Sequence, residues 1–213
     1  MSQKISIMLV DDHALVRAGV GRLLEQYPAY EVIAEAENGE KAYQLFGEIK
    51  PDVLIIDLSM PGIGGLEAIR RILMRYPKAN ILVLSMHENL SFANQAMKLG
   101  AKGYIIKNSL ADELIQAIES VSKGNIYLSE ELAEQVVLQS SNPKNDPVHD
   151  LSAREFEIFR LLAEGKEIDY IAKTLNISVK TVSNYQTAIK QKLGVHNAIE
   201  LIRYALRVGA IKN

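Results

Sequence analysis

We predict an α/β domain followed by an all-α domain, because the hydrophobic pattern changes character partway along the chain. Up to about residue 124, short apolar runs without alternation recur between amphipathic segments, as in a parallel sheet covered by helices on both faces. Beyond residue 150 every amphipathic segment has helical spacing. Between them, Ser140–Asp150 holds two prolines and almost nothing apolar, which is typical of a linker.

Five strands are predicted in the first part. Four are buried apolar runs, and the remaining one alternates as a more exposed strand would; their ranges are Ile5–Val10, Glu31–Glu37, Val53–Ile56, Ile81–Ser85 and Gly103–Ile106. Helical segments follow each strand, with apolar positions such as Leu15, Val16, Val20, Leu23 and Leu24 in the first and a capping-box pattern at Ser109 and Asp112 in the last. Five strands alternating with five helices predict a doubly wound, five-stranded parallel sheet.

The second part is predicted to be a small four-helix domain. Its helices are expected at roughly Ser152–Glu164, Glu167–Leu175, Ser178–Leu193 and Asn197–Val208. One further helix is expected before the linker, at Ser129–Leu138. The predicted division is therefore residues 1–124, a connecting segment with one helix at 125–149, and residues 150–213.

Composition narrows the class of protein. The 213 residues are 48% apolar and 23% charged with net charge −2, as in an ordinary soluble protein. No apolar run approaches the ~18 residues of a membrane span, and no signal peptide precedes the first strand. The absence of cysteine excludes disulfides, thiol chemistry and cysteine-ligated zinc, and we expect a cytoplasmic location. Residues 1–149 have 14 Lys and Arg against 19 Asp and Glu, whereas residues 150–213 have 10 against 7, which indicates different partners for the two parts.

Reactive side chains are predicted where the strands end. Asp11 and Asp12 follow the first strand, Asp57 follows the third, Ser85 ends the fourth and Lys107 follows the fifth. In a doubly wound sheet these ends converge on one crevice. Clustered carboxylates suit Mg²⁺, a carboxylate can accept a phosphoryl group, and a lysine can neutralise that group. We interpret Asp57 as the reactive group, since an apolar strand has no packing reason to finish in Asp. The alternative, that these residues only cap helices, is weakened because all of them stand at strand ends.

These residues resemble the receiver domain of two-component response regulators over residues 1–124, with the CheY-like fold. The matching motifs are the pair Asp11-Asp12, Asp57 in DLSMPG, Ser85 and Lys107. The resemblance implies that Asp57 is the phospho-acceptor and that Mg²⁺ is held by Asp11, Asp12, Asp57 and the backbone carbonyl of Ser59. It also implies that Ser85 and Lys107 bind the phosphoryl group, and that Tyr104 swings inward with Ser85. Asn108 departs from the pattern, because many receivers have Pro after the lysine.

The second part contains a long stretch that has lysines but no acidic residues. From Tyr170 to Ile199 there are thirty residues without one Asp or Glu, which favours a polyanionic partner. Two helices separated by a short turn at residues 176–178 are spaced as in a helix-turn-helix, whose second helix enters the DNA major groove. Polar residues lie opposite the apolar stripe of that second helix and are expected to contact DNA; they are Lys180, Ser183, Asn184, Thr187 and Lys190.

The same segment resembles the LuxR-type DNA-binding domain in LSAREFEIFRLLAEG, IAKTLNISVKTVSNY and IKQKLGV. A receiver followed by this domain is the layout of the NarL/FixJ family. Residues 168–170, Tyr185 and Ala198 depart from common residues of the domain, and Tyr185 resembles the GacA-type branch of global regulators. The final helix has two apolar sides, one of which could pair two copies.

We therefore expect a phosphorylation-dependent transcription regulator rather than an enzyme. The resemblance implies a sensor histidine kinase as phosphodonor, promoter DNA as target and a homodimer when phosphorylated. One alternative is a phosphatase or phosphotransferase with an Asp nucleophile, although Ser59 stands where such enzymes often have a second carboxylate. Another is a receiver whose helical domain binds protein or RNA.

Overall fold

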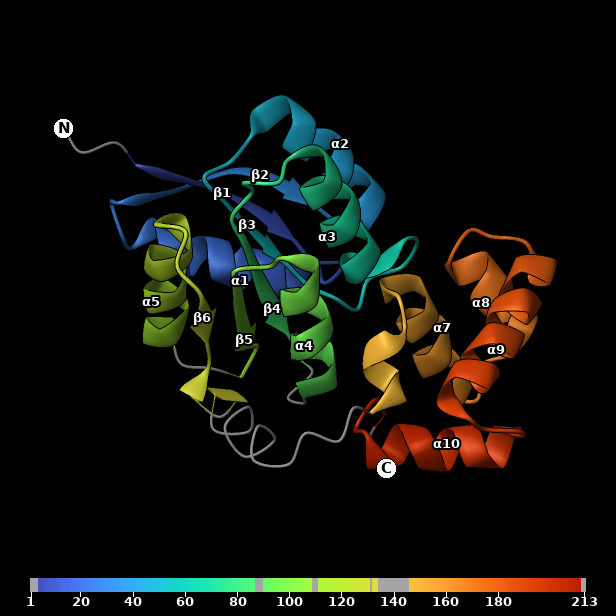
Figure 1. Cartoon of the computed structure of the whole chain (residues 1–213). Coiled ribbons are helices and arrows are strands. Elements are labelled where there is room, and N and C mark those ends of the chain that lie inside the picture. Colours follow the sequence, from blue (N-terminus) through green and yellow to red (C-terminus); the bar gives the residue numbers. More distant parts are fainter. Residues whose placement is uncertain (1–3, 87–89, 109–110, 131, 134–145, 212–213) are drawn as a thin grey trace.

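The computed structural model describes residues 4–86, 90–108, 111–130, 132–133 and 146–211. Its first part alternates strands and helices (Figure 1). The elements are β1 (Ile5–Val10), α1 (Ala14–Glu25), β2 (Tyr30–Ala36), α2 (Gly39–Ile49), β3 (Val53–Ile56), α3 (Gly64–Arg75), β4 (Ile81–Ser85), α4 (Leu90–Leu99), β5 (Gly103–Ile106), α5 (Ala111–Ser122) and β6 (Tyr127–Leu128).

The strands form one parallel sheet in the order β2-β1-β3-β4-β5-β6. The predicted doubly wound parallel sheet is confirmed, but the count of five strands was wrong. The sixth strand, β6, pairs with β5 through Gly103 and Tyr127. Its two residues are too few to produce a periodic signal, and Ile126 just before them is 70% exposed.

Helices cover both faces of the sheet. Side chains alternate along each strand. One set packs against α1 and α5, with Leu24 and Ile118 among the buried residues, and the other packs against α2, α3 and α4, with Phe46 and Ile69. Both faces of β3 are therefore buried, which explains its unbroken apolar run.

The second part consists of four α-helices preceded by a short 3-10 helix: η1 (Pro147–Asp150), α7 (Ala153–Ala163), α8 (Ile168–Thr174), α9 (Val179–Leu193) and α10 (Ala198–Arg207). A capping box between Ser152 and Glu155 begins α7. The four predicted helices match these within a residue or two. The end of the predicted linker is instead structured, because Val148 in η1 is 1% exposed. Of the helix expected at Ser129–Leu138, Ser129 itself is not helical, residues 130, 132 and 133 are helical, and residues 131 and 134–138 fall outside the described residues, as does Ser109.

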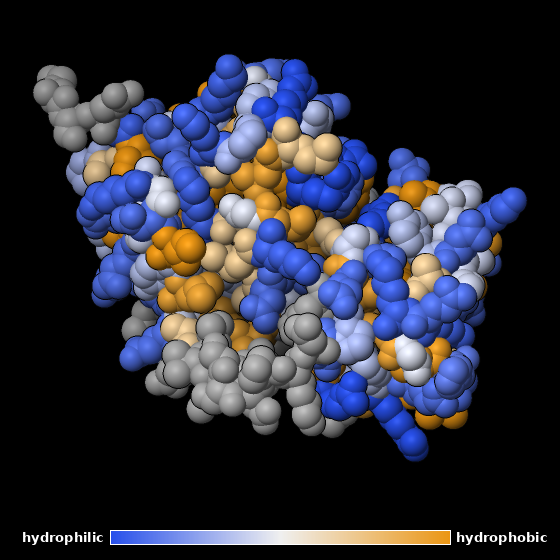
Figure 2. Space-filling view, in the orientation of Figure 1, coloured by the Kyte–Doolittle hydropathy of each residue, from blue (hydrophilic) through white to orange (hydrophobic). Residues whose placement is uncertain are grey.

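The two domains pack together through α3, α4, α7 and η1 (Figure 1). The ring of Phe92 on α4 meets that of Phe156 on α7 edge to face, with centroids 4.9 Å apart. Gln95 Nε2 donates to the carbonyl oxygens of Val148 and Leu151, both at 3.2 Å. Figure 2 shows apolar side chains gathered over the middle of this face of the molecule and a mainly hydrophilic rim. Within the described part of the chain, no helix has the length and apolar character to cross a membrane.

Candidate functional site

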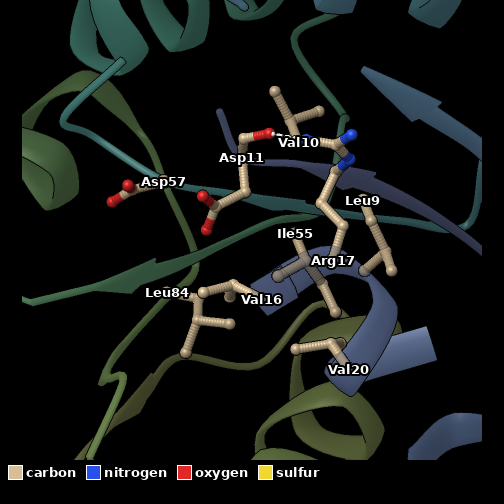
Figure 3. A pocket seen from close by; sticks show the side chains of 9 residues that line it. All are labelled: Leu9, Val10, Asp11, Val16, Arg17, Val20, Ile55, Asp57 and Leu84. Atoms are coloured by element: carbon tan, nitrogen blue, oxygen red, sulfur yellow. Dashed lines mark hydrogen bonds between the residues drawn. The ribbon is translucent and has the colours of Figure 1, made fainter. Parts of the chain in front are cut away.

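The strand ends bring two carboxylates and a lysine together. Lys107 Nζ lies 2.8 Å from Asp57 Oδ2 and 2.6 Å from Asp11 Oδ2. Figure 3 shows the side chains of Asp11 and Asp57 side by side at the end of the sheet. Asp57 is 2% exposed, and its Oδ1 accepts a hydrogen bond from Leu58 N at 2.7 Å. Because β1, β3 and β5 are parallel, the residues after them share one edge of the sheet.

Burial and charge set the protonation of this site. Burial raises the pKa of Asp57 above its ordinary value, and the lysine beside it opposes that shift only in part. Burial alone would lower the pKa of Lys107, but hydrogen bonds to Asp11 and Asp57 outweigh it and raise that pKa. Lys107 is therefore a fixed cation facing Asp57, placed to attract an anionic group.

Atoms that could hold a cation lie next to Lys107 and Asp57. A carboxylate oxygen from each of Asp11, Asp12 and Asp57 and a ring nitrogen of His13 lie within 4.8 Å of one another. His13 Nδ1 is 2.8 Å from Asp12 Oδ1, yet none of the described residues makes a well-formed hydrogen bond to that buried oxygen. A buried carboxylate oxygen without a donor fits a cation. The prediction did not include His13 in the site, although its place after the acidic pair could have indicated it.

Gly65 allows the first turn of α3 to pack closely against the backbone at the end of β3. A Cβ on this residue would lie 2.1 Å from the backbone oxygen of Asp57, so only glycine allows the approach. Gly62 and Gly64 have φ of +83° and +69°, which lets the chain turn back within a few residues. Ser59 lies in this short turn after Asp57.

The two predicted switch residues are adjacent and buried. Ser85 and Tyr104 are both 0% exposed, and their side chains share a hydrogen bond. Burial raises the pKa of the Tyr104 hydroxyl, so the ring stays neutral. Lys107 N donates to Ser85 O at 2.8 Å, which ties the end of β4 to the lysine. The Tyr104 ring thus lies in the core, one hydrogen bond away from the strand-end site.

In the second domain, α8 and α9 form the predicted helix pair. Asn176 turns the chain with φ +51°, and Ser178 caps α9 by accepting a hydrogen bond from Thr181 N. Val182, Ile189 and Leu193 of α9 are buried in the domain core. One face of α9 therefore packs against the domain core, and the opposite face points away from it.

The predicted DNA-contacting residues lie on that outward side. Lys180, Asn184 and Thr187 are exposed, and Ser183 and Lys190 are partly exposed. The hydroxyls of Ser183 and Thr187 each donate to the backbone oxygen four residues earlier, at 3.1 Å, so each offers a lone pair rather than a proton to a partner. Lys192, in the same basic stretch, lies 2.7 Å from Glu155 and is neutralised.

Both halves of the chain match known domain families. Residues 7–119 match the response regulator receiver domain, and residues 149–205 match the bacterial regulatory proteins of the luxR family. A parallel sheet with an acidic strand-end site, followed by a helix-turn-helix domain, defines a response regulator.

The chain belongs to the NarL/FixJ family of response regulators. It is 38% identical to response regulator UvrY of Escherichia coli K12, over 96% of this chain and 95% of UvrY. It is 37% identical to response regulator GacA of Pseudomonas aeruginosa, over 97% and 98% of the two chains. Its structure resembles that of RcsB from Salmonella enterica serovar Typhimurium bound to a promoter with the phosphomimetic BeF3⁻, with a TM-score of 0.73, 31% identity and coverage of 97% of this chain and 100% of RcsB. The predicted family is confirmed.

Proposed function

We propose that phosphorylation of Asp57 controls the binding of this chain to promoter DNA. The proposal rests on the contact of Lys107 with both Asp57 and Asp11 at the sheet edge, in a chain that also has an outward polar face on α9. The likeness to RcsB, which is bound to a promoter in the presence of a phosphomimetic, supports it. We propose a cytoplasmic regulator with residues 1–124 as the phospho-acceptor domain, 125–149 as the connection and 150–213 as the DNA-binding domain.

The chemical step is the transfer of one phosphoryl group. A carboxylate oxygen of Asp57 forms a bond to phosphorus while the bond from phosphorus to the donor breaks, and the donor keeps that electron pair. The donor is a phosphohistidine of a sensor kinase or a small acyl phosphate. Lys107 attracts the incoming phosphoryl oxygens, and the Ser85 hydroxyl can donate to them.

Mg²⁺ is the cofactor that fits this site. Asp11, Asp12 and Asp57 offer carboxylate oxygens, and the backbone carbonyl of Ser59 lies in the adjoining turn. When bound, the ion offsets the negative charge of the phosphoryl group. The role of this chain is to hold three carboxylates close together and to keep Lys107 charged opposite Asp57.

The signal leaves the site through Ser85 and Tyr104. A phosphoryl group adds about −1.5 to −2 charge at pH 7, which draws the Ser85 hydroxyl toward Asp57 and alters its bond with Tyr104. The surface that responds lies around β5 and α5. A groove of about 350 Å³ runs there between α1 and α5, lined by Val16, Leu84, Ile106 and Leu114 among others. Apolar lining of this kind suits contact with a second copy.

Ser85→Ala is expected to accept phosphate but to lose phosphate-induced dimerisation. The variant keeps Asp57 and Lys107, while the hydroxyl that joins the phosphoryl group to Tyr104 is gone. Sedimentation velocity of the full chain with and without acetyl phosphate and Mg²⁺ measures the effect, with Ser122→Ala, a partly exposed serine at the last residue of α5, as control. Dimerisation equal to that of the wild type would refute the coupling.

DNA is read by α9. We propose that Asn184, with Ser183 or Thr187, reaches base edges and that Lys180 and Lys190 contact phosphates. On α10, Leu201 and Tyr204 close the domain core, while Ile199 is 65% and Leu206 is 37% exposed. This second apolar side is free to pair two copies, which predicts a two-fold symmetric operator with half-sites about one helical turn apart.

Asn184→Ala is expected to weaken specific binding by about 1–3 kcal/mol and to relax preference at one base pair, whereas Lys180→Ala should weaken all sequences alike. Gel-shift titrations on a bound promoter duplex and a scrambled duplex separate the two effects. Lys166→Ala, an exposed lysine of the same domain outside α9, is the control. If both α9 variants bind every duplex like the wild type, this helix is not the reading element.

The other candidate functions have less support. An enzyme with an Asp nucleophile often uses a second carboxylate two residues on, where this chain has Ser59. A helical domain that binds protein or RNA would bind duplex promoters without sequence preference. Salt-dependent, sequence-selective binding to duplex DNA distinguishes our proposal from that one.

A further inference from the structure

The DNA-binding domain is docked on the loop that follows Asp57. Gly62 N, in the turn between β3 and α3, donates to the backbone oxygen of Thr174 at 2.9 Å. This bond links the segment after the phospho-acceptor directly to the end of α8. Together with the ring contact of Phe92 and Phe156, it places the β3–α3 turn at the centre of the domain interface.

Glu157 of α7 is enclosed in this interface. Its side chain is 11% exposed, and its Oε2 accepts a hydrogen bond from Arg154 Nη1 at 2.9 Å. Its other oxygen faces the receiver so closely that a Cβ on Gly64 would lie 1.9 Å from it. The carboxyl group is therefore pressed between its own domain and the first residue of α3.

The charges around Glu157 come from both domains. Arg154 and Arg160 lie on α7. Arg154 also donates to Leu175 O, and Arg160 is paired with the carboxylate of Glu164. On α3, Glu67 repels a second negative charge, although it is paired with Arg70 and Arg71. At the β3–α3 turn, Glu40 accepts a hydrogen bond from Ile63 N.

Burial raises the pKa of Glu157 by more than Arg154 and Arg160 together lower it. The pKa therefore rises from its ordinary value of 4.5 to about 7, and Glu67 adds to the shift. The burial on the Gly64 side exists only while the domains are docked, so the docked form holds this proton more tightly than the separated form does.

We propose that Glu157 is a proton-dependent contact between the two domains, which holds the DNA-binding domain on the β3–α3 turn when protonated and weakens that docking when ionised. The direction follows from proton linkage, because the form that binds the proton more tightly is favoured by acid. The docking equilibrium should shift toward separation as pH rises from about 4.5 to about 7 and stay constant above that. This contact goes beyond the proposed function, since it requires neither phosphate nor DNA.

A distance measurement between the domains tests the proposal. The chain has no cysteine, so Glu25→Cys on α1 and Asp169→Cys on α8, both exposed, create the only two labelling sites. Pulsed electron spin resonance on the labelled, unphosphorylated full chain gives the ratio of docked to separated forms from pH 5.5 to pH 8. We expect this ratio to fall by up to about tenfold per pH unit below pH 7.

Two variants test whether Glu157 is the residue responsible for the pH dependence of docking. Glu157→Gln, which cannot ionise, should be at least as docked at every pH as the wild type is at pH 5.5, and its docking should not change with pH. Glu167→Gln, an exposed glutamate of the same domain, should keep the wild-type pH dependence. If the wild type is fully docked throughout, the titration is repeated with Phe92→Ala, which removes the ring contact with Phe156 and leaves Glu157 in place. A constant ratio in that background, or pH dependence that survives in Glu157→Gln, would overturn the proposal.

Discussion

Replacing Asp57 with Asn will abolish phosphorylation of the chain. The amide has no anionic oxygen to attack phosphorus, and the neighbouring Asp11 already contacts Lys107 through one oxygen. Because burial raises the pKa of Asp57, removing its charge also removes a desolvation cost, so the variant should remain folded. Intact mass after incubation with acetyl phosphate and Mg²⁺ should show one added phosphoryl group in the wild type and none in Asp57→Asn.

Two further variants complete this experiment. Asp12→Ala should also lose labelling, since it removes a carboxylate from the proposed cation site. Asp112→Asn changes an exposed carboxylate on α5 and should be labelled like the wild type. If Asp57→Asn still gained a full phosphoryl group, the acceptor would be another carboxylate, such as Asp11 or Asp12.

Phe156→Ala is expected to destabilise the DNA-binding domain by about 3–5 kcal/mol. The ring is 0% exposed and packs against both Phe92 of the receiver and Phe159 of its own helix, so truncation leaves a cavity at the domain interface. Urea denaturation followed by circular dichroism measures the loss. Tyr170→Ala, which truncates an aromatic ring that is 51% exposed in the same domain, should cost far less. Equal losses in the two variants would show that the Phe156 ring is not a core residue.

The elements with long or strongly apolar patterns could be predicted from the sequence. β3 is buried on both faces and ends at a carboxylate, and α9 has a regular apolar stripe, so each reveals its surroundings in its own residues. The contact of Lys107 with Asp57 joins residues fifty positions apart, yet it follows from parallel strands sharing one edge.

What depends on contact between the domains could not be predicted. The polar appearance of α4 suggests an exposed helix, but Ser91 and Gln95 are buried where α4 packs against the second domain, and they donate hydrogen bonds to backbone oxygens of that domain. Conversely, Leu15 belongs to the apolar pattern of α1 but is 86% exposed. A periodic pattern gives the direction of a face, not what covers it.

The interface residue Glu157 illustrates the same limit. In the sequence it is one of several glutamates on an amphipathic helix, with Arg154 at the spacing of an ordinary surface pair. Only the fold places it against Gly64 of the other domain. Its burial, and the pKa that results from it, are properties of the docked pair of domains.

The central claim is that phosphate on Asp57 controls DNA binding by the helical domain. The most direct test is to sequence the genomic DNA fragments retained by the full chain with and without acetyl phosphate and Mg²⁺, in parallel with Asp57→Asn. The account predicts that phosphorylation of the wild type enriches fragments sharing a two-fold symmetric sequence, and that Asp57→Asn gives no phosphate-dependent enrichment. The same fragments retained to the same extent by the wild type in both conditions would contradict it.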